Sequence, residues 1–389
     1  MTDIDHVLIS GSYGTKNLGD TKILEGLTHL CQENYPDAEV IAASVDPSDT
    51  MAYTSIDRAI PTIESDPIRW LQTIREVDLV ILGGGSVINH THFCPRHSLI
   101  SAIAFTFNID IYVSGGAYDT QGIVRKATRH YLNIVDAITV RDPRSKEIIR
   151  SMGVKEPVEV VPDPGFVSTG TDSIDEFDIP KEYILVNIRY VAKGSVDRSA
   201  IASALDDFNS SSNHKIIFFP FHRGEGKDTK ISEEIIQEMK TRASIFDEEY
   251  TIGQVESIIK NADAMVGMRL HSMILAAHMR TPLIPISYNI KCDSFLEQIG
   301  VQDWFKWSDI NERKLSAKIV ENTKNESSMA SIEEKIESLE KNCTEILPTC
   351  DSQCRNSSLL SYIVLIPYSV LLTVIYAKSR LVQSIRTQP

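Results

Sequence analysis

Short apolar runs that end on glycine or on a charged residue recur along the chain, and stretches with helical spacing separate them. His6–Ser10 (HVLIS) is followed by GSYGTKNLGD, after which Thr21–Leu30 places its apolar residues on one helical face. A strand, a glycine-rich turn and a helix in this order predict the opening unit of a doubly wound α/β sheet. The glycines match neither the dinucleotide nor the Walker pattern, so they indicate either close approach of a ligand or a tight turn alone.

Two more apolar runs in the first half also end in glycine. Asp78–Leu82 continues into GGGS, and Ile111–Ser114 ends at Gly115 and Gly116. Strands of a parallel sheet that end in glycine predict a cleft lined by bare backbone.

Charged residues follow the next two apolar runs. Ala137–Val140 ends at Arg141, which is a candidate ligand group or else the partner of Asp142 or of a helix terminus. Val158–Val161 runs into the rigid turn PDPG, whose Asp163 either holds a hydroxyl in the cleft or fixes the turn through its own backbone.

A second alternation of strands and helices begins after the predicted linker, residues 169–180. Tyr183–Ile188 ends at Arg189, and Lys215–Phe219 precedes PFHR, whose His222 is more typical of a surface residue than of a catalyst. Both runs predict strands of a second parallel sheet.

The stretch VGMRLHSMILAAHMRTPLIPISYNIK carries the strongest chemical signal. A predicted strand, Asp263–Met268, leads into a helix that opens with Arg269, His271 and Ser272, where Ser272 is a candidate N-cap. Another strand follows, and Lys291 lies just beyond it. A helix N-terminus, an arginine fork and a histidine at the carboxyl edge of a sheet predict a site for a small reactive anion.

These patterns predict an α/β protein with two Rossmann-like, doubly wound domains, at residues 1–168 and 181–310. A helical extension, residues 311–350, should follow. Within it Ser331–Leu347 repeats apolar residues at intervals of four and three, which favours an amphipathic helix packed on the body over a coiled-coil seam.

The uncharged run Leu359–Ala377 predicts attachment to a membrane. Its 19 residues would extend about 28 Å as a helix, just enough for the ~30 Å bilayer core. Bases after the run predict a cytoplasmic C-terminus, while the absence of a signal sequence predicts a cytoplasmic body. A single membrane span cannot place both the body and the C-terminus in the cytoplasm. The segment would then be kinked, interfacial or re-entrant, or would serve as a tail anchor.

The amino-acid composition limits the kinds of ligand that the chain is expected to bind. The net charge of −14 over 389 residues argues against nucleic acid as the main ligand. The six cysteines show no metal-ligand spacing beyond a single i,i+4 pair and indicate ordinary thiols.

Taken together, these segments resemble the polysaccharide pyruvyl transferase family. The matching pieces occur in family order over roughly residues 7–300, namely GSYGTKNLGD, GGGS, VRD (Val140–Asp142), DPGF (Asp163–Phe166), RLHS (Arg269–Ser272) and SYNIK ending at Lys291. The combination is specific, although each piece alone is weak.

The resemblance implies a GT-B-like fold with the active site between its domains, and transfer of the pyruvyl group of phosphoenolpyruvate to a sugar. It implies that Arg141, Arg269 and Leu270 contact the donor, that His271 serves in acid–base chemistry and that Lys291 completes the anion pocket. Further candidate substrate-binding residues are Gly14, Asn17, Asp20, Gly84, Gly85 and Asp163.

The residue types suit that chemistry. Phosphoenolpyruvate carries a carboxylate and a phosphate, which call for cations held apart, such as Arg141 and Arg269. His271 as imidazolium is the best-placed acid, and His271, Asp20 or Asp163 would be the base. The sequence shows no metal-binding constellation, so we expect metal-independent chemistry with no cofactor other than phosphoenolpyruvate as co-substrate.

Two other functions remain open. One is a GT-B glycosyltransferase with a nucleotide-sugar donor, because a fold does not determine a function. The other is a membrane-tethered glycan-binding or scaffold protein with an inactive site. With the predicted tail, a surface or lipid-linked glycan is the expected acceptor.

Overall fold

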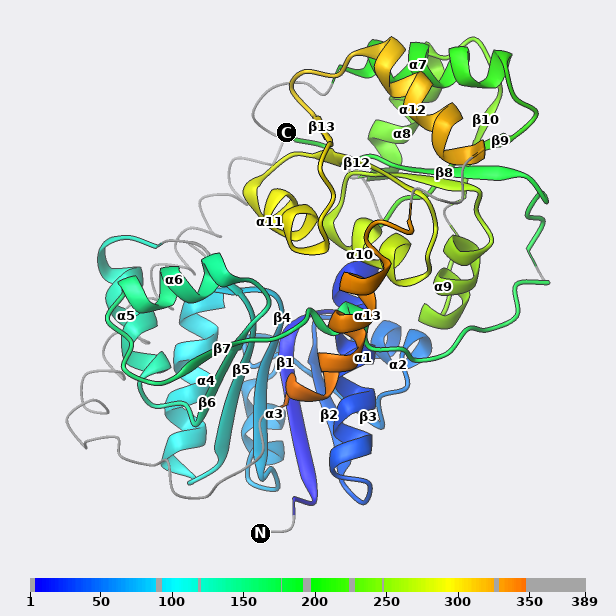
Figure 1. Cartoon of the computed structure of the whole chain (residues 1–389). Helices are drawn as coiled ribbons and strands as arrows, with labels where there is room; N and C mark the ends of the chain where they lie inside the picture. Colours follow the sequence, from blue (N-terminus) through cyan, green and yellow to red (C-terminus); the bar gives the residue numbers. More distant parts are fainter. Residues whose placement is uncertain are drawn as a thin grey trace, which may run out of the picture.

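The parallel strands form two separate sheets, each covered by helices (Figure 1). The structure is a computed structural model, which describes residues 4–88, 93–117, 120–175, 177–191, 197–223, 228–246, 248–324 and 329–347. The two-sheet α/β architecture predicted from the sequence is confirmed.

The first sheet has seven strands in the order β3-β2-β1-β4-β5-β6-β7. All of its neighbouring strands are parallel. Its strands are β1 (His6–Tyr13), β2 (Glu39–Ser44), β3 (Arg58–Pro61), β4 (Leu79–Ile88), β5 (Asp110–Ala117), β6 (Ala137–Val140) and β7 (Val158–Val160). Its helices are α1 (Leu18–Asn34), α2 (Pro47–Tyr53), α3 (Pro67–Thr73), α4 (Phe93–Thr106), α5 (Gly122–Leu132) and α6 (Pro143–Ser151).

The second sheet has six parallel strands in the order β10-β9-β8-β11-β12-β13. Its strands are β8 (Tyr183–Asn187), β9 (Lys215–Phe218), β10 (Ala243–Ile245), β11 (Ala264–Gly267), β12 (Leu283–Ser287) and β13 (Phe305–Lys306). The helices that follow β8 are α7 (Arg198–Ser210), α8 (Asp228–Glu238), α9 (Ile252–Lys260), α10 (Leu270–His278), α11 (Ile290–Ile299), α12 (Glu312–Lys324) and α13 (Glu333–Lys341). In both sheets the strand order reverses beside the first strand, and such switch points are where open α/β sheets bind ligands.

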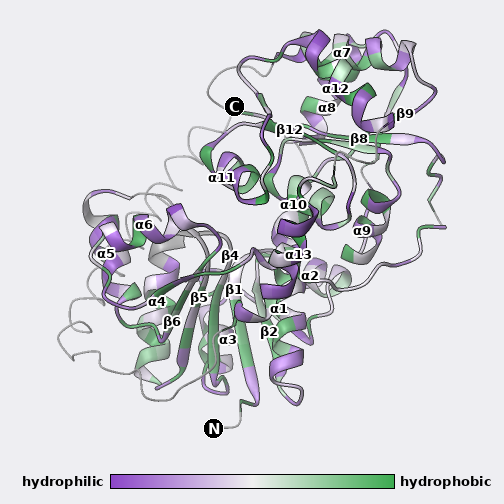
Figure 2. Ribbon diagram, viewed as in Figure 1, coloured by the Kyte–Doolittle hydropathy of each residue, from purple (hydrophilic) through white to green (hydrophobic). Residues whose placement is uncertain are grey.

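One apolar cluster joins the two halves. It includes Leu27 of α1, Ile258 of α9, Ile274 of α10 and Ile336 of α13, whereas two other clusters each lie within one half. Figure 2 shows the strands of the first sheet mainly in hydrophobic colours and hydrophilic residues gathered on helices such as α13. The halves therefore share a core, which holds the carboxyl edges of the two sheets toward each other.

The amphipathic helix predicted over Ser331–Leu347 packs on the body, as expected, but it is shorter. α13 ends at Lys341, and a 3-10 turn, Asn342–Glu345, follows it. Ile336 and Ile346 are buried, and the carbonyl of Ile346 accepts a hydrogen bond of 3.4 Å from Thr139 Oγ1 of β6.

No helix among the described residues is long and apolar enough to cross a membrane. The predicted membrane segment, Leu359–Ala377, lies outside the described residues.

Candidate functional site

Backbone contacts between the halves bring the two sheet edges together. The amide of Leu18 donates to the carbonyl of Phe221 over 2.8 Å, and the amide of Arg223 donates to the carbonyl of Lys16 over 3.0 Å. Asn17, which caps α1 by accepting from the amide of Gly19, lies within this bridge. The turn after β1 is therefore held against the turn after β9.

A cavity of about 200 Å³ lies at this junction, and we call it the donor cavity. Both halves line it. Its residues are Ser12, Asn17, Asp20, Gly85, Arg141, Phe221, Arg269, Leu270, His271, Tyr288 and Lys291. Eight of these eleven residues were singled out from the sequence, whereas Ser12, Phe221 and Tyr288 were not.

Arg269 is placed at the start of α10 by polar contacts from neighbouring strands. Its amide donates to Asn187 Oδ1 at the end of β8 over 3.0 Å. Its guanidinium donates through Nε and Nη2 to the two oxygens of Asp228, at 2.5 and 2.7 Å. Because Arg269 is the N-cap and α10 begins at Leu270, the hypothesis that Ser272 caps this helix is wrong. The Ser272 hydroxyl instead donates to the carbonyl of Arg269.

Asp228 is a site residue that sequence reasoning missed. It is fully buried at the start of α8, and its carboxylate also accepts from the amide of His222. An acidic residue at a helix start is ordinarily a cap, and nothing local connects Asp228 with an arginine 41 residues further along.

Arg141 and Asp163 form a buried ion pair in the first half, with Nη1 2.9 Å from Oδ2. The alternative that Arg141 pairs with Asp142 is wrong, because Asp142 caps α6 by accepting from the amide of Ser145. Asp163 also accepts from the amide of Gly165, so it fixes its turn as well. Burial alone would raise the pKa of Asp163, but His271, Arg141 and the Gly165 hydrogen bond outweigh it and hold the pKa below its usual value.

His271 lies in the first turn of α10 against the bare backbone of Gly19 on α1. A Cβ at Gly19 would lie 2.2 Å from the Nδ1 atom of His271. The Nε2 atom is 3.8 Å from Asp163 Oδ1, which is an ion-pair distance but not a hydrogen bond. The pKa of His271 is lowered to about 4, chiefly by burial and also by the cations Arg141, Lys291 and Arg269, against the opposing effect of Asp163.

Asp20 faces the same cavity from the first turn of α1. It accepts a hydrogen bond of 2.7 Å from Asn17 Nδ2. Burial raises the pKa of Asp20 to about 6, although Lys291, Arg269, the Asn17 hydrogen bond and Arg141 all act in the opposite direction. The cavity thus contains a carboxyl that holds its proton unusually well and an imidazole that holds it poorly.

Lys291 enters the cavity from the first turn of α11, which Asn289 caps. Its Nζ atom lies 5.9 Å from the ring centre of Tyr288. The guanidinium of Arg189 covers the same ring at 4.3 Å. The ring of Tyr288 therefore lies within cation–π distance of two cations.

Three predicted substrate-binding residues do not line the donor cavity. Gly14 has a positive φ of 71°, and its missing side chain makes room for Ser44 and Asp46. Gly84, with φ of 100°, lies against the hydroxyl of Tyr13. Asp163 lies behind Arg141 and contacts the cavity only through Arg141 and His271.

No group of three or more His, Cys, Asp or Glu side chains in the described part of the chain is arranged to hold a metal ion. Independence from metal ions stays a prediction.

The two facing parallel sheets with a cavity between them define a GT-B-like fold. Solved structures with this architecture include UDP-GlcNAc 2-epimerase from Neisseria meningitidis bound to UDP-GlcNAc (TM-score 0.58, 10% identity, covering 88% of this chain and 98% of that chain). They also include MnaA from S. aureus with UDP (TM-score 0.57, 10% identity, 88% and 94%). A third is UGT89C1 from Arabidopsis thaliana with UDP (TM-score 0.56, 11% identity, 95% and 99%). At these identities the likeness shows the fold alone.

The family model described as polysaccharide pyruvyl transferase matches residues 17–290. The chain therefore belongs to the polysaccharide pyruvyl transferase family, as the sequence motifs predicted, and is a transferase of polysaccharide biosynthesis. A search of curated proteins found no match.

Proposed function

We propose that the chain transfers the pyruvyl group of phosphoenolpyruvate to two hydroxyls of a sugar in a polysaccharide or lipid-linked glycan. The observation that carries this proposal is the donor cavity, where Arg141 of the first half and Arg269 and Lys291 of the second half line one space. A small ligand with a carboxylate and a phosphate requires cations on more than one side. The arginines suit this role because each is already oriented by a buried carboxylate.

The proposed reaction needs one carbon to be protonated and two hydroxyls to lose protons. C3 of the donor gains a proton, and the first hydroxyl attacks C2 and gives its proton to a base. The bond between C2 and the phosphate oxygen then breaks, and the second hydroxyl attacks C2 and loses its proton. Of the two hydroxyl protons, one replaces the proton placed on C3 and the other leaves on the released phosphate, so the products are a cyclic ketal and inorganic phosphate.

We assign the proton transfers to His271, with Asp20 as the second titratable group in the cavity. Because the pKa of His271 is about 4, its imidazole is neutral in the empty cavity at pH 7. Negative charge on a bound donor raises the pKa of a neighbouring imidazole, so donor binding favours the imidazolium that protonates C3. After that transfer the neutral ring accepts a hydroxyl proton. Two titratable groups with oppositely shifted pKa values in one cavity are typical of acid–base catalysis.

Calorimetric titration of the full chain with phosphoenolpyruvate tests the donor. We expect saturable binding that Arg269→Ala weakens by about 10- to 100-fold, because a charged hydrogen-bonding group is lost. Arg313→Ala, an exposed arginine on α12, is the matched control and should bind as the wild type does. Absence of phosphoenolpyruvate binding, together with binding of UDP-GlcNAc, would overturn the proposal in favour of a nucleotide-sugar glycosyltransferase.

The role of His271 has its own measurement, the release of phosphate from phosphoenolpyruvate in the presence of acceptor. His271→Ala should retain donor binding and lose turnover by about 10²- to 10⁴-fold. His29→Ala, a partly exposed histidine on α1, is the control. A His271→Ala rate close to that of the wild type would show that another group supplies the proton.

We further propose a cytoplasmic body that attaches to the membrane through Leu359–Ala377. The support is the length and lack of charge of that run. A chain that ends at residue 350 should keep activity on soluble sugars and lose co-sedimentation with membranes. Full retention at the membrane would contradict the proposed role of the run.

A further inference from the structure

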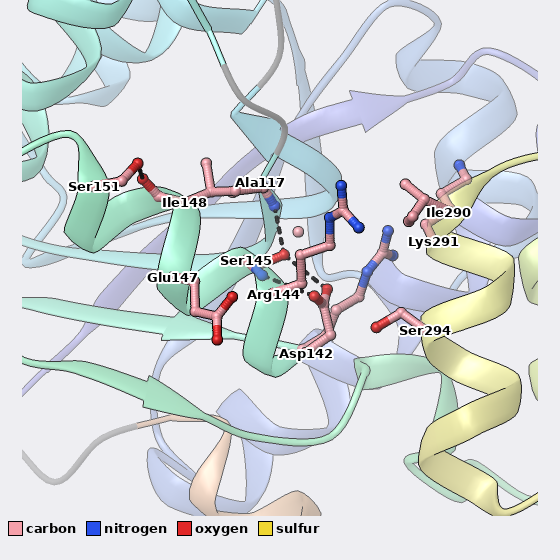
Figure 3. Close-up of a pocket in the computed structure, with 12 residues that line it drawn as sticks. Ala117, Asp142, Arg144, Ser145, Glu147, Ile148, Ser151, Ile290, Lys291 and Ser294 are labelled. Atoms are coloured by element: carbon pink, nitrogen blue, oxygen red, sulfur yellow. Dashed lines mark hydrogen bonds between the residues drawn. The ribbon is translucent and has the colours of Figure 1, made fainter.

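A second cavity, of about 390 Å³, adjoins the donor cavity and shares Arg141 and Lys291 with it. It opens between α6 of the first half and α11 of the second half, and we call it the α6–α11 cavity (Figure 3). Its volume falls within the ~300–1,000 Å³ of small-molecule sites. Since Arg141 and Lys291 line both spaces, a ligand here would meet a donor beside those two side chains.

The floor of the α6–α11 cavity is a closed set of hydrogen bonds. The amide of Ala117 donates to Ser145 Oγ over 2.9 Å. Ser145 donates through its hydroxyl and its amide to the two oxygens of Asp142, at 2.7 and 2.8 Å. Asp142 is therefore occupied by the capping of α6.

The guanidinium of Arg141 packs against the backbone of Gly116 at this floor. A Cβ at Gly116 would lie 2.9–3.1 Å from the guanidinium atoms of Arg141. The cation that the two cavities share is thus held in place by a close approach that only glycine permits.

The walls combine apolar surface, a hydroxyl and a cation. Ile290 of α11 is 43% exposed, and the half-buried Ile148 of α6 also lines the space. Figure 3 shows the side chain of Arg144 extending into the space between α6 and α11, and the hydroxyl of Ser294 pointing into it from α11.

This combination suits a saccharide that carries an acidic group. Sugar rings present apolar faces as well as hydroxyls, which match Ile290 and Ser294. The planar fork of Arg144 matches a carboxylate or a phosphate, which it can bind with two parallel hydrogen bonds. Within the described residues Arg144 has no carboxylate at ion-pair distance, and the structure places it at the surface.

We propose that the α6–α11 cavity binds the acceptor saccharide and that Arg144 selects acceptors bearing a phosphate or a carboxylate. The inference rests on the proposed pyruvyl transfer and adds the position and the charge class of the second substrate. The acceptor hydroxyls would reach C2 of the donor past Arg141 and Lys291.

Calorimetry on the full chain, with and without saturating phosphoenolpyruvate, tests the proposal. The probes are methyl glycosides of galactose, glucose, mannose and N-acetylglucosamine, the corresponding 1-phosphates, and methyl galacturonide and glucuronide. We expect at least one charged probe to bind about tenfold or more tightly than its neutral counterpart. A preference for the 1-phosphates points to a phosphate-linked acceptor, and a preference for the uronides to an acidic polysaccharide.

Variants then locate the binding. Arg144→Ala should remove the advantage of the charged probes and leave phosphoenolpyruvate binding unchanged. Arg150→Ala, on the exposed side of the same helix, should change neither. Ser294→Trp, which fills the cavity from α11, should abolish binding of all saccharide probes but not of phosphoenolpyruvate.

The proposal is overturned if no probe binds the wild-type chain, if charged and neutral probes bind alike, or if Arg144→Ala behaves as Arg150→Ala does. Failure of the proposed function is a separate result, because in that case the wild-type chain itself does not bind phosphoenolpyruvate.

Discussion

Lys22 and the arginines of the donor cavity are buried or partly buried cations between the two halves, and their surroundings differ. Near the linker, Lys22 of α1 is completely buried with its Nζ atom 2.5 Å from Glu256 of α9. The same ammonium donates to the carbonyl of Val167 over 2.7 Å and contacts Thr169 Oγ1 at 3.3 Å. An ammonium has three N–H donors, and three oxygen atoms of the protein surround this one.

Each arginine of the donor cavity is anchored by a carboxylate that does not itself line the cavity. Arg269 gives Nε and Nη2 to Asp228, and the described residues offer no partner to its Nη1. Arg141 is anchored to Asp163 and lines the cavity as well. A buried cation with a complete set of acceptors is a cross-link, whereas one that is held from behind and borders a cavity can bind an anionic ligand.

The largest expected effect tests the cross-link. Lys22→Met should lower the free energy of unfolding by about 3–5 kcal/mol, because it leaves the carboxylate of Glu256 buried without its partner. Denaturant unfolding of the full chain measures the change. If the pair is purely structural, phosphoenolpyruvate affinity in the folded variant stays that of the wild type.

A double variant sharpens the same comparison. Lys22→Met with Glu256→Leu replaces both charges by apolar groups and should recover most of the lost stability. A double variant as unstable as Lys22→Met alone would contradict the cross-link account.

The next largest effect concerns the carboxyl of Asp20, which lines the donor cavity. Its folded pKa of about 6 lies above its ordinary value of 3.8. At a pH between 3.8 and about 6, Asp20 keeps a proton in the folded chain that it has released in the unfolded chain. The stability that this bound proton contributes is therefore lost as the pH rises through about 6. The loss approaches about 3 kcal/mol. Asp20→Asn should therefore gain stability relative to the wild type from pH 4 to pH 7.

Unfolding of Asp20→Asn and wild type at several pH values makes this measurement, with the exposed Asp37→Asn as the control. A difference between Asp20→Asn and wild type that does not change with pH would show that Asp20 is not held protonated by burial.

The smallest of these effects concerns the position of the His271 ring and not the charge of a side chain. Gly19→Ala would place a Cβ 2.2 Å from the present site of His271 Nδ1, so the ring must move. A displacement of about 1 Å can cost about 100-fold in rate. We expect kcat to fall by that order with phosphoenolpyruvate affinity nearly unchanged, since the donor cations are untouched. Glu33→Ala, exposed on the same helix, is the control, and equal kcat values for the two variants would contradict the positioning role of Gly19.

The alternation of apolar runs and helical patterns was enough to predict many elements close to their observed bounds. Ala137–Val140 is strand β6 as predicted, and the helix after it begins at Pro143. The short edge strands Arg58–Pro61 (RAIP) and Ala243–Ile245 (ASI) were missed, because a polar residue or a proline interrupts their apolar residues and leaves no continuous apolar run to indicate a strand.

The sequence by itself determined the two-sheet α/β class, the family and most residues of the donor cavity, since strands that end in glycine or arginine report locally on the carboxyl edge of a sheet. Only the tertiary structure decided that Arg141 pairs with Asp163, that Asp228 orients Arg269, that Gly19 seats His271 and that the α6–α11 cavity shares two cations with the donor cavity. Each of these contacts joins different elements across the sheets or the two halves. No local pattern contains them, because side-chain partners are chosen by how the elements pack and not by the spacing of residues along the chain.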